Sequence, residues 1–316
     1  MPIEPSCSLS RRRFLGASLG AGVAAALATD PSRRVFAETP RALPPVGVFS
    51  KVYQELNLSF EESAAVTAEA GLDGIDCPVR PAGQVLPERA TEDLPRYAHA
   101  LAARRLKILL LTTAIQSADT PHAESILRAA SKLGVKHYRL GYWSYKPGQP
   151  AAARLGEIKA QLKDLAAMNR QLGLCAVLQN HAGKDLVGAR LRDYFEIARA
   201  FDPRDVAIAF DIGHAIHELG ENWRAEFDTL RSRFAVAYVK DWKRGAEFVP
   251  FGQGEVGASG FWPMLRQLKY SKPISFHIEY PWQGSQPKTA ALLTKAMRSD
   301  LAVLREWWNA PSRTPR

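Results

Sequence analysis

The chain has 316 residues, of which 46% are hydrophobic and 23% charged, and its formal net charge is +10. This is too long for one small module, suits one barrel of roughly 250 residues, and has the composition of an ordinary soluble globular protein. Residues 1–37 hold five arginines against two acidic residues, so the remaining chain carries +7. No block of Lys and Arg with interleaved aromatics follows, so nucleic acid is not an expected partner. We interpret the remaining excess as solvated surface charge, with an anionic ligand as the alternative.

The N-terminal segment has the pattern of an export signal. Residues 10–15 have the sequence SRRRFL, and an uncharged run rich in Ala and Gly follows over residues 16–29. A cationic start before a short, weakly hydrophobic core is typical of such signals, and paired arginines before x-Phe-Leu resemble a twin-arginine signal. The small residues Val35 and Ala37 predict cleavage after Ala37.

Export would make the protein periplasmic and the twin-arginine machinery one of its partners. The alternative is an uncleaved amphipathic arm or a membrane anchor. Residues 16–29 are too few to span a bilayer comfortably, so we expect no stable membrane anchor.

Eight short apolar runs alternate with longer amphipathic stretches after the signal. The runs cover residues 46–52, 72–79, 107–115, 135–142, 174–181, 206–214, 235–242 and 274–280. Between the first two, Ser59 and Glu62 form a capping-box pattern that starts a helix. Alternating strands and helices require parallel strands with helical crossovers, and eight repeats predict a closed (β/α)₈ TIM barrel over residues 38–316. An open doubly wound sheet is the alternative, but no Gly-rich dinucleotide fingerprint follows the first run.

Three cysteines occur, and their spacing matches no disulfide or zinc framework. Cys7 lies in the signal, whereas Cys77 and Cys175 lie in apolar runs. We expect the latter two to be buried free thiols, with a disulfide between them as the alternative.

Polar side chains close the sixth and eighth runs. Active sites of such barrels lie at the C-terminal ends of the strands, and side chains two apart share a face. In residues 206–214, the alternation of side chains along the strand predicts that Asp211 points into the barrel, with His214 just beyond it. In residues 274–280 the same alternation turns His277 and Glu279 inward. We interpret Asp211 and Glu279 as functional groups, with a structural cap and a buried His–Glu pair as the alternatives.

The fifth and seventh runs also end in polar residues. Gln179 and His181 share one face, and Asn180 begins the following loop. Tyr238 and Lys240 share one face of the seventh run. Lys240 could carry a proton, anchor an anion or pair with a carboxylate, and the sequence does not separate these three roles.

The first strands contribute a less specific rim to the predicted site. Arg80 follows the second run and could clamp a sugar hydroxyl or an acidic group. Aromatic side chains stack on sugar faces, which makes tyrosine and tryptophan candidates at this rim. Further candidates are Lys51, Thr113, Arg139, Tyr142 and Trp143.

Four motifs in chain order resemble the sugar phosphate isomerase/epimerase family with a xylose isomerase-like barrel. They are QNH at 179–181, FDIGH at 210–214, YVKD at 238–241 and HIEY at 277–280. The resemblance spans the whole predicted barrel. It implies one divalent metal held by Glu, Asp, His and Glu from the last four strands.

This chain keeps two of those four implied ligands. Asp211 and Glu279 match the second and fourth, whereas Gln179 stands in place of the first Glu and Tyr238 in place of the His. His214 matches a residue that contacts substrate or, in the endonuclease branch, metal. The resemblance thus predicts a metal site of Asp211, Glu279, Gln179 and His214 for Mn, Zn, Co or Mg, although Gln is a weaker, neutral ligand.

The predicted function is that of an exported carbohydrate-active isomerase or epimerase with metal-assisted proton abstraction beside a sugar carbonyl. Glu279, Lys240 and His214 are the predicted catalytic residues. The predicted substrate contacts are Arg80, Asn180, His181, Tyr238, His277 and Trp143. Since Gln179 cannot take a proton, the two-carboxylate scheme of inverting family members is not expected.

Alternatives from other classes remain open at this stage. A lyase or hydratase acting on keto-sugars or 3-keto-glycosides would use the same chemistry. Two further alternatives would not use this chemistry. One is a barrel that binds a sugar or a partner protein without turnover, and the other is DNA repair, as in the endonuclease IV branch. The sequence names neither the sugar nor the oligomeric state.

Overall fold

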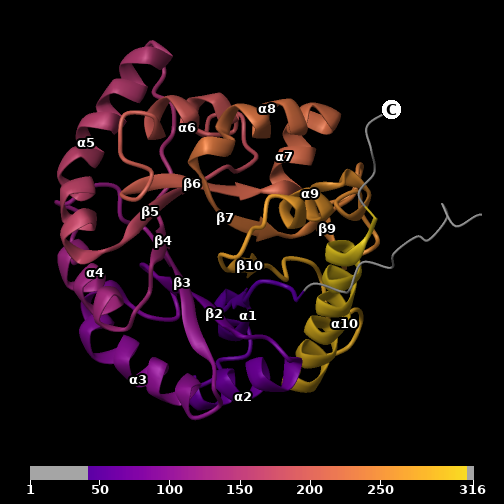
Figure 1. The fold of residues 1–316 in the computed structure, drawn as a ribbon. Coiled ribbons are helices and arrows are strands. Elements are labelled where there is room, and N and C mark those ends of the chain that lie inside the picture. Colours follow the sequence, from indigo (N-terminus) through magenta and orange to yellow (C-terminus); the bar gives the residue numbers. More distant parts are fainter. Residues whose placement is uncertain (1–41, 312–316) are drawn as a thin grey trace, which may run out of the picture. The chain divides into compact units, whose positions relative to one another are not determined.

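The eight predicted apolar runs all become strands of one closed parallel barrel (Figure 1). The computed structural model describes residues 42–311, which belong to one compact unit, Arg41–Arg316. The predicted signal, its cleavage site and Cys7 lie outside the described residues. Hydrogen-bonded neighbours follow the order β1-β10-β7-β6-β5-β4-β3-β2, which closes through the pairing of β1 with β2. The predicted (β/α)₈ barrel is confirmed.

The barrel strands are shorter than the apolar runs that predicted them. Their bounds are β1 Val46–Phe49, β2 Gly74–Val79, β3 Lys107–Thr113, β4 His137–Arg139, β5 Cys175–Gln179, β6 Val206–Asp211, β7 Phe234–Val239 and β10 Ile274–Phe276. Strands β7 and β10 end directly before polar residues, whereas β5 and β6 include Gln179 and Asp211 as their last residues. His181, Lys240, His277 and Glu279 therefore lie just beyond their strands.

Helices surround the barrel, apart from the short helix at Lys51–Gln54, which lies inside the ring of helices (Figure 1). Their bounds are α1 Lys51–Gln54, α2 Phe60–Ala70, α3 Ala90–Ala102, α4 Ala123–Lys132, α5 Ala151–Leu172, α6 Leu191–Ala198, α7 Ile212–Leu219, α8 Trp223–Leu230, α9 Phe261–Gln267 and α10 Ala290–Asn309. The predicted capping box is confirmed: Ser59 Oγ accepts from the Glu62 amide, and the Glu62 carboxylate accepts from the Ser59 amide. No helix among residues 42–311 is both long and apolar enough to cross a membrane.

Strand β6 shows how side-chain parity divides the core. Ile208 and Phe210 join the layer between strands and helices, where the Phe210 ring lies 4.9 Å from that of Phe227. Ala207 and Ala209 join a separate cluster inside the barrel. The same alternation brings Asp211 inward at the mouth, as predicted.

A short hairpin stands on the mouth after β7. It pairs β8 Asp241–Trp242 with β9 Phe248–Val249 in antiparallel fashion. The Asp241 carboxylate accepts four backbone N–H groups, those of Trp242, Gly252, Gly254 and Val256. One buried carboxylate thereby holds the loop that carries Phe248 to the mouth.

Both cysteines of the described region are buried free thiols, which confirms that expectation for Cys77 and Cys175.

Candidate active site

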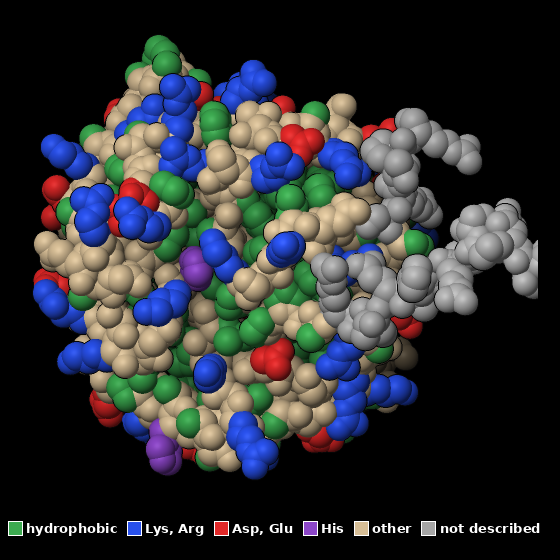
Figure 2. All heavy atoms as spheres, in the orientation of Figure 1, with side chains coloured by type: hydrophobic (Ala, Val, Ile, Leu, Met, Phe, Trp, Pro, Cys, Tyr) green, Lys and Arg blue, Asp and Glu red, His purple; other side chains and the backbone are tan. Residues whose placement is uncertain are grey.

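The C-terminal ends of the strands surround a cavity of about 140 Å³, called here the inner cavity. Lys and Arg side chains lie on several sides of the hollow at the centre of this face, where acidic ones are fewer (Figure 2). The lining residues are Phe49, Lys51, Arg80, Thr112, Arg139, Tyr142, Gln179, His181, Lys240, His277 and Glu279. Six predicted site residues thus meet at one small, polar cavity: Arg80, Gln179, His181, Lys240, His277 and Glu279.

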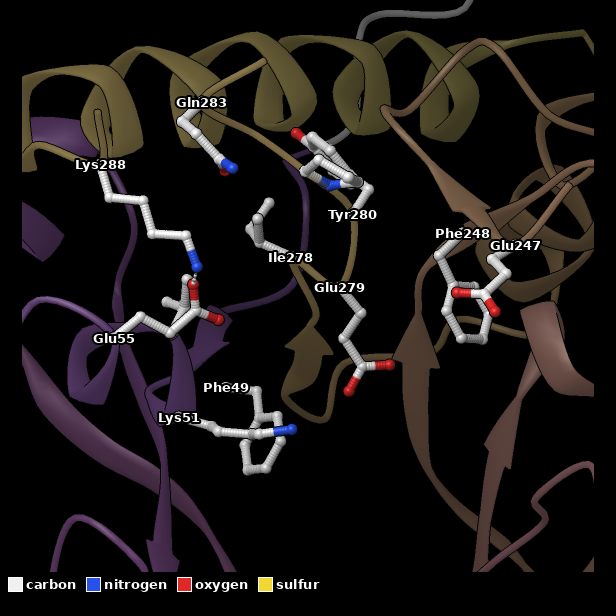
Figure 3. Close-up of a pocket in the computed structure, with 12 residues that line it drawn as sticks. Phe49, Lys51, Glu55, Glu247, Phe248, Ile278, Glu279, Tyr280, Gln283 and Lys288 are labelled. Carbon is white, nitrogen blue, oxygen red and sulfur yellow. Dashed lines mark hydrogen bonds and ion pairs between the residues drawn. The ribbon is translucent and has the colours of Figure 1, made fainter. Parts of the chain in front are cut away.

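A larger outer cavity of about 470 Å³ opens beside it. The two cavities share Phe49, Lys51 and Glu279. Figure 3 shows the Glu279 carboxylate between the rings of Phe49 and Phe248, with the Lys288–Glu55 ion pair on the far side. Glu279 therefore lies where a ligand in the inner cavity would meet a group extending outward.

The Lys240 ammonium is the centre of the polar cluster. Its Nζ lies 2.7 Å from Glu279 Oε2, 3.1 Å from His214 Nε2 and 3.4 Å from Asp211 Oδ2. Lys240 is 2% exposed and Asp211 fully buried, whereas 26% of the Glu279 side chain is exposed. One cation thus holds two carboxylates and an imidazole together, and of these four groups only Glu279 lines both cavities.

These contacts set the charge of each group. Burial alone would lower the pKa of Lys240, but Asp211 and Glu279 outweigh it and raise that pKa. Burial opposes ionisation of Glu279, yet Lys240 and His277 hold its pKa well below the usual range. Burial, reinforced by the Lys240 charge, lowers the pKa of His214 to about 3. At neutral pH the cluster therefore contains an ammonium, two carboxylates and a neutral imidazole that accepts from Lys240.

The Asp-x-Gly-His motif forms the junction between β6 and α7. Asp211 is the N-cap of α7, and its Oδ1 accepts the backbone N–H of His214 at 3.2 Å. A Cβ added to Gly213 would lie 2.7 Å from the Lys240 carbonyl oxygen and 2.8 Å from its Cγ. The glycine is thus required for the close passage of the Lys240 chain.

Gln179 joins the cluster to the β4 side of the cavity. Its Nε2 donates to Asp211 Oδ2 at 2.9 Å, and its Oε1 accepts from the Tyr142 hydroxyl at 2.8 Å. Both ends of the amide are therefore occupied. Neither end can act as a base, in agreement with the sequence-based expectation.

Two histidines complete the wall of the inner cavity. His181 Nδ1 lies 2.7 Å from the Ala182 carbonyl oxygen, and its ring lies 3.9 Å from that of His214. His277 Nδ1 lies 3.6 Å from Glu279 Oε1, and the His277 ring stacks on Phe49 at 4.7 Å. Both side chains are held in place by aromatic neighbours before any substrate arrives.

The predicted metal ligands are arranged around an ammonium. Among residues 42–311, no group of three or more His, Cys, Asp or Glu side chains is positioned to hold a metal ion. Asp211 Oδ2 and His214 Nε2 are 3.9 Å apart, but Lys240 Nζ contacts both, and Gln179 presents its NH₂ group to Asp211 rather than its oxygen. This arrangement fits a monovalent cation from the chain itself, because a second, divalent cation beside Lys240 would be repelled.

Three predicted substrate contacts lie away from both cavities. Asn180 is used structurally: its Nδ2 donates to the Asp211 carbonyl, and its Oδ1 accepts from the Asp211 amide. Tyr238 is fully buried in the barrel interior, 5.3 Å from the His277 ring. Trp143 is 2% exposed and donates from Nε1 to Gln161 on α5. Their strand-end positions suggested the cavity, but local bonding and packing direct them elsewhere.

Some lining residues carry no signal that sequence reasoning used. Phe49 ends β1 and looks like an ordinary core residue. Phe248 comes from the hairpin beyond β7, and its ring lies 4.8 Å from Lys240 Nζ. Thr112 rather than Thr113 lines the cavity, because the Thr113 hydroxyl donates to the Arg139 carbonyl.

The fold and the site define a class: a (β/α)₈ barrel whose strand ends enclose a small polar cavity, with a partly buried carboxylate beside a buried lysine. Residues 64–307 match the model of the family described as xylose isomerase-like TIM barrel. The chain belongs to that family. No curated protein sequence matches the chain at a significant level.

Several solved structures share the fold. The apo 3-keto-D-glucoside 4-epimerase from E. coli is 15% identical, with a TM-score of 0.64 over 83% of this chain and 99% of that one. D-psicose 3-epimerase from Clostridium cellulolyticum, solved with D-tagatose, is 11% identical, with a TM-score of 0.64 over 84% and 99%. The IOLI protein, solved with a bound zinc atom, is 14% identical, with a TM-score of 0.66 over 84% and 99%. At these identities the likeness concerns the fold.

Proposed function

We propose that this protein is a carbohydrate-active isomerase that moves a proton between the carbonyl carbon of a sugar and the carbon next to it. The observation that carries the proposal is the Glu279–Lys240 pair, 2.7 Å apart, at the boundary of the two cavities. A carboxylate base beside a fixed cation is what enolisation of a carbonyl compound needs. Sugar epimerases among the proteins that share the fold support the substrate class.

Glu279 is the proposed base. Its carboxylate takes the proton from the carbon next to the carbonyl, and the C–H electron pair becomes the new C=C bond of an enediolate. Returning that proton to the neighbouring carbon, with a proton shift between the two oxygens, interconverts an aldose and a ketose. The low pKa of Glu279 keeps it ionised before the substrate binds, and it also makes the carboxylate a weak base while Lys240 is bonded to it.

Lys240 is the proposed electrophile. Its ammonium donates to the carbonyl oxygen as negative charge develops there, which stabilises the enediolate. A substrate oxygen that takes over this hydrogen bond weakens the Lys240–Glu279 pair and so makes Glu279 a stronger base. His214, neutral and accepting from Lys240, positions the ammonium.

A single base favours isomerisation over inversion. Gln179 occupies the place where a second carboxylate would be needed, and both ends of its amide are already bonded. A lyase or hydratase would share the first proton abstraction and differ in its product. Epimerisation remains part of the proposal only in a one-base form.

The metal-assisted version of this reaction stays a prediction from the family resemblance. The observed cluster places the ammonium of Lys240 among three of the four predicted ligands. We therefore assign the stabilising charge to Lys240 and route no step through a metal ion.

We also propose that the protein is exported by the twin-arginine route and acts on an unphosphorylated sugar or glycoside in the periplasm. Arg11 and Arg12 before the Phe14-Leu15 pair support this proposal. Replacing both arginines with lysine should retain the protein in the cytoplasm of a host with this machinery, as fractionation and blotting would show. Unchanged export would contradict it.

Hydrogen exchange from solvent tests the reaction directly. The protein is incubated with D-fructose, D-psicose or D-xylulose in D₂O, and ¹H NMR follows the loss of C–H signals next to the carbonyl. We expect exchange with at least one keto-sugar, loss of exchange in Glu279→Gln, and normal exchange in the exposed control Glu306→Gln. Sugar binding without exchange for every keto-sugar and keto-glycoside tried would favour the non-catalytic binding barrel instead.

A further inference from the structure

One wall of the inner cavity carries positive charge that the protein does not neutralise. Arg139 is the last residue of β4, Arg80 directly follows β2, and Lys51 begins α1 after β1. All three side chains line the inner cavity. None of their side chains forms an ion pair within the described part of the chain.

Arg139 is buried without a counter-ion. The residue is only 4% exposed, and its guanidinium carbon lies 4.5 Å from the centre of the Tyr142 ring. Nη2 donates to the Thr113 carbonyl at 3.3 Å, whereas the buried Nη1 has no hydrogen-bond partner. A buried charged donor left unpaired is costly, so a ligand that accepts from it would be strongly favoured.

Arg80 approaches the same region from β2. Its guanidinium is half-buried and lies 5.7 Å from the centre of the Phe49 ring. Burial lowers the pKa of Arg80, and the charge of Arg139 lowers it further. The two guanidinium groups are therefore close enough to repel each other in the absence of a ligand.

The carboxylates near the two arginines are hydrogen-bonded to other side chains. Asp76 on β2 attracts Arg80 from a distance, but its Oδ1 accepts from the Thr112 hydroxyl at 2.9 Å and its Oδ2 from the Ser275 hydroxyl at 2.6 Å. Glu279 is bonded to Lys240. Within residues 42–311, therefore, neither arginine forms an ion pair with a carboxylate.

We propose that Arg80 and Arg139 form a subsite for a carboxylate group on the substrate, so that the natural substrate is a sugar acid rather than a neutral sugar. A planar guanidinium matches a carboxylate in a bidentate fashion. The inner cavity, about 140 Å³, suits a single sugar ring whose acidic group is directly attached. A phosphate ester would bring the same kind of charge in a bulkier form.

This assignment rests on the proposed function for its orientation. With the carboxylate held on the β2–β4 wall, the rest of the sugar extends towards Lys240 and Glu279 on the β7–β10 wall. One wall then fixes the substrate and the opposite wall reacts with it. The acidic group would also neutralise the repulsion between the two arginines.

Binding of matched sugars tests the subsite without requiring turnover. Isothermal titration of the full-length protein compares D-glucuronate, D-glucose and D-glucose 6-phosphate. We expect D-glucuronate to bind at least about tenfold more tightly than D-glucose, the gain typical of one charge-assisted interaction. Arg80→Gln and Arg139→Gln should reduce that preference to within about threefold. The control Arg104→Gln, which removes an exposed arginine before β3, should retain it.

The outcomes separate this inference from the proposed reaction. Equal binding of D-glucuronate and D-glucose, or a preference that survives in Arg80→Gln, would overturn the subsite. A preference for D-glucose 6-phosphate alone would replace the carboxylate by a phosphate. Arg80→Gln decides the matter if Arg139→Gln fails to fold, because Arg80 is only half-buried. If D-glucuronate binds as expected and no sugar acid undergoes deuterium exchange, the carboxylate subsite is supported and the proposed isomerase reaction is contradicted.

Discussion

The two walls of the inner cavity carry similar numbers of charged groups but arrange them differently. On the β6–β7–β10 wall, Lys240 contacts Asp211 and Glu279 directly, and the charges are paired. On the β2–β4 wall, Arg80 and Arg139 contact aromatic rings, and no carboxylate in the described region forms an ion pair with them. The paired charges hold their positions before the substrate binds. The unpaired arginines would receive their counter-charge from the substrate.

The difference assigns separate tasks to the two walls. A preorganised pair suits a reaction in which charge develops in the transition state and needs a fixed partner. An uncompensated pair of guanidinium groups suits recognition of a charge that the substrate already carries. Four predictions test or sharpen this contrast.

Replacing the Glu279 carboxylate should have the largest effect. Glu279→Gln keeps the shape of the side chain but removes the proposed base, so the rate of deuterium exchange should fall by about 10²- to 10⁴-fold. ¹H NMR in D₂O measures this rate. Binding of the sugar should change far less, and a variant that keeps more than a tenth of the wild-type rate would move the base elsewhere.

Removing the central cation should destabilise the paired wall. Lys240→Met leaves Asp211 buried without its counter-ion, which we expect to reduce the free energy of unfolding by about 3 kcal/mol in urea titrations. Adding Asp211→Asn should restore part of the loss, because the uncompensated charge is then gone. If the double variant is no more stable than the sum of the two single changes predicts, the ammonium is not the partner that stabilises Asp211.

A methyl group at the β6–α7 junction should disturb the same wall more mildly. Gly213→Ala places a carbon 2.7 Å from the Lys240 carbonyl oxygen and 2.8 Å from its Cγ, so we expect a loss of about 2 kcal/mol and slower exchange. Gly156→Ala on α5 is the matched control, since its added Cβ meets nothing within 4 Å. Thermal and urea unfolding compare the two variants. Equal stability would show that Lys240 can shift at little cost.

The smallest effect concerns the loop that carries Phe248. Burial and the nearby Asp241 charge raise the pKa of Asp300 to about 6, although the Tyr280 hydroxyl and the Phe251 amide donate to it. Because the folded pKa exceeds the unfolded value of about 3.9, the free energy of unfolding should fall by up to about 2 kcal/mol as pH rises from 4 to 7.

Asp300→Asn tests this dependence, since an amide can donate to Tyr280 and still accept from Phe251. In the variant, the free energy of unfolding should fall less between pH 4 and pH 7 than in the wild type, because residue 300 no longer ionises. Urea titrations at several pH values measure this difference. The same slope in both proteins would mean that another group titrates.

The sequence placed the residues of the β6–β7–β10 wall correctly, because side chains alternate in direction along each strand. Asp211 is two residues beyond Ala209 on one face of β6, and Glu279 keeps the parity of His277 beyond β10. The barrel itself followed from eight apolar runs. None of these inferences required knowledge of which side chains meet in space.

The same reasoning failed where bonding across elements decides position. Asn180 and Trp143 lie at strand ends, but Asn180 is bonded to the Asp211 backbone and Trp143 to Gln161. The roles left open for Lys240 also depend on distances to residues from other strands. The sequence predicted Arg139 only as one of several rim candidates. That it lacks an ion-pair partner among the described residues depends on how the barrel packs, which no local sequence pattern shows.

The central claim is that Lys240, and not a metal ion, supplies the positive charge at the reacting oxygen. We would treat the full-length protein with EDTA, verify by elemental analysis that no transition metal or magnesium remains, and measure deuterium exchange into the best keto-sugar substrate. We predict that exchange continues at an undiminished rate and that Lys240→Met abolishes it. Exchange that stops on chelation and returns with manganese, zinc, cobalt or magnesium would contradict the claim.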